Sequence, residues 1–302
     1  SFSYWRIKDG YSSRVPELVN VPQKPDKIKN HFWFSNQTQT NHRLILVGDS
    51  HIASLAPTFK KWSANRGADF AVSIWNGCQL ILNMNRVFKA DHKPNKHCNV
   101  ELQNNRIEFL ESSQPSIVLI GGRLPLLLHE KRFDNGEGGY EGKMLEYLQD
   151  ADNPLVSQSD RQAAITDNYK ITVQRVIDAG HTVVLMYPVP EVGINVPKTL
   201  LKRIDDKYLS ARDIVTQDPI TTAHAVFIER TKSSFQLLDS IEDDRVLRIF
   251  PSEIFCNSAI LGRCITHDSE VSFYRDDDHL SDFGAELVLM EFEKMVFPSG
   301  AK

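Results

Sequence analysis

Five short apolar segments, separated by stretches with helical spacing, limit the folds open to this chain. Each segment has the length and composition of a buried strand, and they lie at residues 43–47, 69–74, 116–120, 182–187 and 245–250. Strands that alternate with helices form βαβ units, in which parallel strands are covered by helices on both faces. The sequence therefore predicts a three-layer α/β/α sandwich with a mostly parallel sheet. In such sheets, functional side chains gather beyond the carboxyl ends of the strands.

The regions around these strands suggest the domain organisation. Helical spacing predicts a helix directly after residue 50, with Pro57 as a source of kinking, and further helices over 100–112, 165–180, 220–238 and 282–297. Residues 1–40 are rich in Pro, Lys, Asn and Gln and have no sustained period. We interpret them as an N-terminal extension or linker that packs on the body. The main domain would span residues 41–302, with a glycine-rich, irregular insertion at residues 125–160.

Composition narrows the function classes. The chain has 302 residues, of which 41% are hydrophobic and 25% are charged, as is usual for a globular protein. Its net charge of −4 argues against wholesale binding of nucleic acid. No apolar run approaches the roughly 20 residues that a membrane-spanning helix requires. The sequence begins with Ser1 rather than Met, which suggests a piece of a longer protein.

The four cysteines lie in two pairs that are local in sequence, at positions 78 and 98 and at positions 256 and 264. Such spacing suggests two disulfides that close loops in an oxidising compartment. The sequence leaves two alternatives open. The cysteines could be four unpaired buried thiols. Alternatively, Cys78 and Cys98 could bind zinc together with His92 and His97, although the usual Cys-x-x-Cys spacing is absent.

The first predicted strand ends in Gly48-Asp49-Ser50. Ser50 would lie at the turn from strand to helix, where a helix N-terminus stabilises negative charge. Gly48 permits a tight turn, and Asp49 would brace it by hydrogen bonds, while His51 would be structural or face a substrate. A serine at such a turn can act as a nucleophile if a base activates it. The alternative is that Ser50 only caps the helix.

A base is available near the other end of the chain, in residues 274–281. Asp276 precedes His279 by three residues, so its carboxylate can accept the imidazole N–H and fix the orientation of the ring. Ser281 is a natural N-cap for the last helix. The alternatives are a solvated acidic turn and an Asp-x-Asp metal site, formed by Asp276 and Asp278, of the kind found in nucleotide-sugar glycosyltransferases. A metal site leaves the histidine and the upstream serine without a role, so we expect none.

The Gly-Asp-Ser block at Ser50 and the Asp276-x-x-His279-Leu-Ser block near the C-terminus resemble the first and last sequence blocks of the SGNH (GDSL-like) hydrolase superfamily. The order and separation of the blocks are also similar, and the resemblance covers residues 41–297. It implies an SGNH or flavodoxin-like fold. It also implies a serine esterase or acyltransferase with a catalytic triad of Ser50, Asp276 and His279.

A narrower resemblance involves Gly-Asp-Ser-His at 48–51, Gly-Cys at 77–78, Pro-Val-Pro-Glu at 188–191 and Tyr-Arg-Asp-Asp-Asp-His-Leu-Ser at 274–281. These segments look like SGNH domains fused behind bacterial acyltransferase-3 membrane domains, which O-acetylate cell-surface polysaccharides such as the O-antigen of lipopolysaccharide. The resemblance implies a preceding multi-span membrane domain and a location in the periplasm, as a domain of a bacterial inner-membrane protein. It also favours the disulfides Cys78–Cys98 and Cys256–Cys264.

The chain departs from the superfamily in its middle blocks. Gly77, after the second strand, is the expected second-block glycine, whose N–H would form an oxyanion hole with that of Ser50. The third block normally provides an Asn, but here Arg123 follows two glycines. Arg123 or Asn76 could replace the missing donor, or Arg123 could be a structural salt-bridge partner. Residues 188–191, at the edge of the expected site, would shape an acceptor groove.

Three functions are compatible with these features. The resemblance favours an O-acetyltransferase that acts through an acyl-serine on a polysaccharide hydroxyl. A carbohydrate acetylesterase would use water instead, and a non-catalytic glycan-binding module would not use the triad. The sequence has no glycine-rich phosphate-binding loop of the kind that would indicate a coenzyme A site, so no cofactor is expected in this chain. The acetyl group, ultimately from acetyl-coenzyme A, would be delivered by the fused membrane domain.

Overall fold

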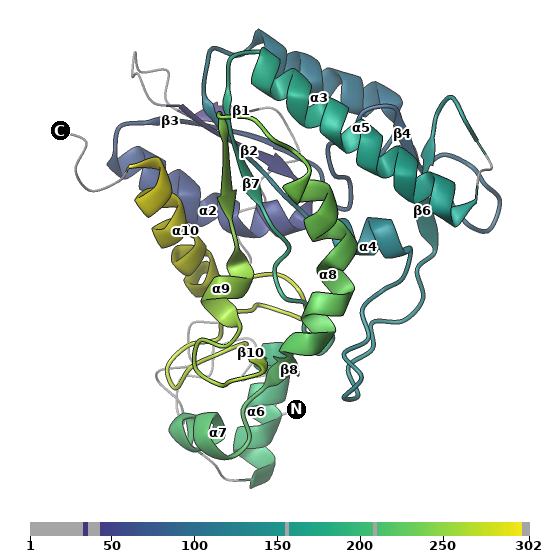
Figure 1. Ribbon diagram of the computed structural model, residues 1–302. Helices are drawn as coiled ribbons and strands as arrows, with labels where there is room; N and C mark the ends of the chain where they lie inside the picture. The colour runs from purple at the N-terminus through teal and green to yellow at the C-terminus, as the bar shows by residue number, and fades with distance from the viewer. Residues whose placement is uncertain (1–32, 36–42, 155–156, 208–209, 298–302) are drawn as a thin grey trace.

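The computed structural model describes residues 33–35, 43–154, 157–207 and 210–297 and has a central sheet covered by helices on both faces (Figure 1). Its six strands have the order β1-β3-β2-β5-β7-β9. The five strands from β3 to β9 are parallel, whereas β1 pairs antiparallel with β3 at one edge. The predicted α/β/α sandwich is confirmed. The strands are β1 (Trp33–Ser35), β2 (Arg43–Gly48), β3 (Asp69–Ile74), β5 (Ile117–Ile120), β7 (Thr182–Met186) and β9 (Val246–Ile249).

Alternate residues of strand β2 face opposite layers, as expected for a strand that is buried on both sides. Leu44 and Leu46 belong to the core beneath α2 (Ser50–Asn65) and α10 (Asp282–Val296). Ile45 and Val47 belong to the core on the other face, beneath several helices. All four side chains are at most 2% exposed, so the turn after β2 starts from a deeply buried strand. These helices include α3 (Val100–Ser112), α5 (Gln158–Asp178) and α8 (His224–Asp239).

Helix α2 follows β2 directly, and Pro57 does not interrupt it. Its apolar face packs against α10, as Figure 1 shows. The rings of Phe59 and Phe292 lie 5.2 Å apart in an edge-to-face arrangement, and Trp62 Nε1 donates to Glu293 Oε1 at 2.8 Å. Burial of this face stabilises the helix enough to offset the backbone hydrogen bond that a proline cannot make.

The segment at residues 125–160 is more regular than expected. It begins within α4 (Leu124–His129) and contains β6 (Glu146–Asp150), which pairs antiparallel with β4 (Met84–Phe88). The leucines of α4 are buried, which explains why this short apolar run forms a helix rather than a loop. The prediction of an irregular insertion is therefore wrong for these elements.

A small subdomain lies beyond the carboxyl end of the sheet, at the bottom of Figure 1. Residues 221–223 of the predicted 220–238 helix form a strand instead, because they pair antiparallel with residues 263–265. The helix starts directly afterwards, as α8. The sequence did not predict the short elements of this subdomain. These elements are α6 (Val196–Lys207), α7 (Ala211–Gln217), β8 (Thr221–Ala223), α9 (Pro251–Phe255) and β10 (Arg263–Ile265).

Most of the predicted N-terminal extension, residues 1–40, lies outside the described residues. The described part is β1, which adds an antiparallel edge strand to the sheet, so this part of the extension does pair with the body. The packing of the other residues of the extension stays a prediction. Among the helices that the structure describes, none has the length and apolar character needed to cross a membrane.

Candidate active site

Ser50 is the first residue of α2 and lies at the carboxyl end of β2, where the sequence placed it. Asp49 is the N-cap of this helix and is 4% exposed. Its Oδ1 accepts from the N–H of His51 at 2.9 Å, and its Oδ2 accepts from the N–H of Arg123 at 2.9 Å. Asp49 therefore braces the turn, as expected, and connects it to the residues that follow β5.

His279 reaches Ser50 from a loop that precedes α10. Its Nε2 lies 2.8 Å from Ser50 Oγ, and its Nδ1 lies 3.0 Å from Asp276 Oδ2. Asp276 Oδ1 also accepts from the N–H of His279 at 2.8 Å, which fixes the carboxylate and the imidazole in one turn of chain. Ser281 caps α10 by accepting from the N–H of Gly284 at 3.2 Å. The structure thus brings together the three residues that the sequence singled out.

Backbone hydrogen bonds connect this loop to the segment that follows β7. Three N–H groups of residues 192–196 donate to the carbonyl oxygens of Asp276 and Asp277, at 3.0–3.2 Å. Because the loop is fixed to the end of a central strand, the position of His279 does not depend on α10 alone.

The segment at residues 188–191 does not form the groove that we expected. All four residues are buried, and Pro190 O accepts from Tyr274 Oη at 2.8 Å. Glu191 forms ion pairs with Arg123 and Arg230. The segment therefore supports the loop that carries His279, through the contact with Tyr274, instead of presenting side chains to an acceptor.

Asp278 is a second carboxylate at the same imidazole, a role that the sequence motifs did not indicate. Its Oδ1 lies 2.7 Å from His279 Nδ1. Its Oδ2 lies 2.5 Å from Arg123 Nη1 and 3.3 Å from His51 Nε2. Asp278 is 4% exposed, so its charge is compensated by these neighbours rather than by water. His51 is likewise buried, which supports its structural interpretation.

The two carboxylates control the protonation of His279. Burial alone favours the neutral ring, but hydrogen bonds to Asp276 and Asp278 raise the pKa of His279 to about 10. Burial would also raise the pKa of each carboxyl, but the hydrogen bonds to His279 hold the pKa values of Asp276 and Asp278 below their usual range. The carboxylates occupy Nδ1, so Nε2 is the nitrogen that can exchange a proton with Ser50.

Arg123 is the centre of a buried ion-pair cluster. Its Nη1 contacts Asp278, and its Nη2 lies 2.5 Å from both Glu141 Oε2 and Glu191 Oε1. Its Nε donates to Glu191 Oε1 at 2.6 Å. All three side-chain nitrogens contact carboxylates, which fits the salt-bridge interpretation. An oxyanion contact from this side chain would have to replace one of these ion pairs.

Gly77 and Asn76 lie in the turn after β3, at the same edge of the sheet as Ser50. Strands β2 and β3 end as a pair, since Gly48 is aligned with Ile74. Gly77 has a φ of +68°, a left-handed conformation that glycine adopts without strain, and Asn76 is exposed. The oxyanion roles of the Ser50 and Gly77 N–H groups and of the Asn76 side chain stay predictions.

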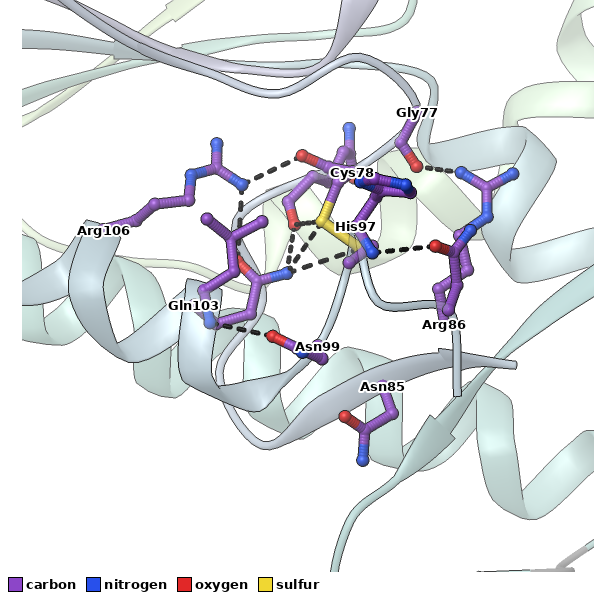
Figure 2. The surroundings of a disulfide bond; sticks show 12 residues. Gly77, Cys78, Asn85, Arg86, His97, Asn99, Gln103 and Arg106 are labelled. Atoms are coloured by element: carbon purple, nitrogen blue, oxygen red, sulfur yellow. Dashed lines mark hydrogen bonds between the residues drawn. A yellow bond between two sulfur atoms is a disulfide. The ribbon is translucent and has the colours of Figure 1, made fainter. Parts of the chain in front are cut away.

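Both expected disulfides are present. Cys78 is joined to Cys98, and Cys256 to Cys264. All four cysteines of the chain are used in these bonds, so neither free thiols nor a zinc site with cysteine ligands fits the structure. The first disulfide directly follows Gly77 and is buried beneath its turn (Figure 2).

The three-layer fold and the hydrogen-bonded series from Ser50 through His279 to Asp276 define the class of SGNH-type α/β domains. The chain belongs to the family described as the SGNH domain fused to AT3 domains, whose model matches residues 21–294. This membership supports an acyl-transferring or ester-hydrolysing activity and an association with a membrane acyltransferase domain.

A solved structure agrees with the fold. The periplasmic domain of a lipopolysaccharide acetyltransferase from Salmonella ser. Paratyphi A is similar, with a TM-score of 0.55 and 17% sequence identity over 85% of this chain and 84% of that chain. A candidate acylhydrolase from Bacteroides fragilis aligns with a TM-score of 0.37 and 12% identity, over 89% of this chain and 88% of that one. No curated protein sequence matches the chain.

Proposed function

We propose that this chain is an O-acetyltransferase domain that moves an acetyl group, through an acyl-serine at Ser50, onto a hydroxyl of a bacterial cell-surface polysaccharide such as the O-antigen of lipopolysaccharide. The observation that supports it most is the 2.8 Å contact between Ser50 Oγ and His279 Nε2, with Nδ1 of the same ring held by carboxylates. A serine that only capped the helix would not need such a base.

In the first half-reaction, neutral His279 accepts the proton of Ser50 at Nε2 while Oγ attacks the acyl carbon. Asp276 and Asp278 stabilise the imidazolium, and N–H groups at the start of α2 and near Gly77 would bind the oxyanion. The imidazolium then protonates the leaving group, and the acyl-serine is left.

In the second half-reaction, the acceptor hydroxyl gives its proton to His279 and attacks the acyl carbon, and Ser50 recovers its proton when the new ester leaves. With water as acceptor, the same steps make the chain a carbohydrate acetylesterase. Ser50 is half-buried and the side chain of His279 is 19% exposed, so the reacting atoms are accessible from solvent.

Family membership supports delivery of the acetyl group by a fused membrane domain, so this chain would need no cofactor of its own. The two disulfides support a location in an oxidising compartment, which for a bacterial inner-membrane protein is the periplasm. The purified chain should therefore hydrolyse small acetyl esters slowly. It should not acetylate a polysaccharide from acetyl-coenzyme A without membranes.

The test compares wild type with Ser50→Ala and His279→Ala in the hydrolysis of a simple acetyl ester. Each variant should lose nearly all activity, and the double variant should lose no more, because the two groups act as one unit. Ser63→Ala is the matched control, since Ser63 lies on the same helix and its hydroxyl has no hydrogen-bond partner among the described residues. Wild-type turnover by Ser50→Ala would refute the mechanism. Absence of acylation in every form would favour a non-catalytic glycan-binding module.

A further inference from the structure

The side chain of Arg106 extends from α3 toward Cys78, beside Gly77 in the turn after β3 (Figure 2), and it is 1% exposed. Three of its acceptors are backbone carbonyls. Its hydrogen bonds are Nη2 to Gly48 O at 3.0 Å, Nη2 to Ser73 O at 2.8 Å, Nη1 to Cys78 O at 2.9 Å, Nη1 to Gln103 Oε1 at 3.3 Å and Nε to Ser73 Oγ at 3.2 Å.

These bonds use the full hydrogen-bonding capacity of the side chain. A guanidinium has five N–H groups in a planar fork, and five acceptors surround this one. None of the five acceptors is a carboxylate, so the direct contacts of this positive charge are neutral dipoles, and the Asp49 carboxylate stabilises the charge without a direct hydrogen bond. Burial accordingly lowers the pKa of Arg106 to about 9, which leaves the group charged at neutral pH. Burying a charge is costly unless the group is paired and hydrogen-bonded, and the hydrogen bonds of Arg106 offset this cost.

The bonded carbonyls belong to the two turns on which the proposed chemistry depends. Gly48 lies two residues before Ser50 in the sequence, and Cys78 directly follows Gly77. One guanidinium therefore connects the turn that bears the nucleophile with the turn that bears the second-block glycine. A direct backbone bond between the turns, from Trp75 N to Gly48 O at 3.0 Å, supports the same spacing.

Other contacts hold the Gly77 turn from its remaining sides without reaching Ser50. Arg86 donates to Gly77 O and forms an ion pair with Glu146. The Cys78–Cys98 disulfide anchors the residue after Gly77. Arg106 differs from these groups because it contacts both turns.

We propose that Arg106 is a positioning residue for acyl transfer, which fixes the spacing between the N–H groups of Ser50 and Gly77 and places a buried positive charge behind the oxyanion that they bind. The inference rests on the proposed function, because it assigns these two N–H groups to the oxyanion. A misplaced or lost oxyanion donor lowers turnover by about 10²–10³-fold. Because the substrate carbonyl carries little charge before reaction, the loss should fall on kcat rather than on KM.

The experiment uses Arg106→Lys, which keeps the charge but has only three N–H donors and no planar fork. Its kcat for a simple acetyl ester should fall about 100-fold, with KM changed less than about threefold. Its affinity for an alkylboronic acid, which forms a tetrahedral adduct with an active serine, should fall by a similar factor. The control is Arg175→Gln, which removes an exposed ion pair between α5 and Glu111 of α3 and should leave both measurements unchanged.

A merely structural role for Arg106 would lower the folded fraction without selective loss of adduct affinity, so circular dichroism and thermal unfolding accompany the kinetics. If Arg106→Lys fails to fold, Ser73→Ala removes only the acceptor of Nε and should lower kcat severalfold in the same direction. If Arg106→Lys folds and has wild-type kcat while Ser50→Ala is inactive, the inference is overturned. If Arg106→Lys does not fold, a wild-type kcat of Ser73→Ala overturns it in the same way. Absence of turnover in wild type would overturn the proposed function together with it.

Discussion

Raising the pH from 7 to 9 should increase the kcat/KM of this chain for an acetyl ester about 100-fold, because only neutral His279 can accept the proton of Ser50. Two carboxylates at Nδ1 raise the pKa of His279 to about 10. Below that pKa, the neutral fraction of the ring, and with it the rate, rises about tenfold per pH unit. The rise should level off near pH 10.

Asp278→Asn tests the cause of this shift. The substitution removes one of the two negative charges at His279 Nδ1 and leaves Asp276 in place. The pKa of His279 should then fall, so the rate should level off at a lower pH than in wild type. The plateau itself should be lower, because the imidazolium that forms in the transition state has lost a partner.

The assay is titration of the acid released from a simple alkyl acetate at constant pH, with Ser50→Ala subtracted at each pH to remove the reaction of hydroxide. The stability of the fold should change in the opposite direction. His279 has a folded-state pKa above its unfolded value near 6.5, so its contribution is fully present below pH 6.5 and is lost as the pH rises through 10. The midpoint of thermal unfolding should therefore decrease over this interval. A wild-type kcat/KM that is constant from pH 7 to 9 would refute the reasoning.

Three further outcomes are expected. Gly122→Ala should destabilise the fold by roughly 1–3 kcal/mol, because Gly122 has a φ of +150° and an added Cβ would lie 2.8 Å from Asp49 Oδ2. Denaturant unfolding measures this loss, and an unchanged unfolding midpoint would contradict the close packing of this turn. Glu191→Gln should cost about 3–5 kcal/mol, since Arg123 and Arg230 would lose a buried partner, whereas an exposed control such as Glu291→Gln should cost little. Peptide mapping without reduction should recover both disulfide-linked peptides from exported protein, and four alkylatable thiols would refute the pairing.

Sequence motifs were sufficient to find Ser50, Asp276 and His279, because their relative positions follow from strand ends and a single turn of chain. Asp278 could not be assigned in the same way. It is the third of three consecutive aspartates, and the conformation of the turn decides which carboxylates face the ring. Arg106 lies in a helix of mixed polar and apolar residues, and no local signal distinguishes it from a solvated arginine. Its burial results from strands that are distant in sequence.

The elements of the fold likewise divide into those with a local sequence signal and those that depend on segments distant in sequence. Strands of the central sheet were recognisable because burial on both faces requires continuous apolar runs. The short strands β8 and β10 have polar residues and are stabilised by each other, so neither is apparent in isolation. Helix α4 and strand β6 could not be predicted within a glycine-rich region for a similar reason. Their partners, α8 and β4, lie elsewhere in the chain.

The contact between α2 and α10 has a consequence for reactivity. Both helices begin at the carboxyl edge of the sheet, so the positive ends of their dipoles converge on the space above Ser50, where they favour negative charge. The ring contact between Phe59 and Phe292 sets how far one helix lies along the other. A slip of the two helices at this contact, about 13 Å along α2 from Ser50, would shift the nucleophile relative to its base. The geometry of proton transfer is therefore determined partly by apolar side chains that no substrate touches.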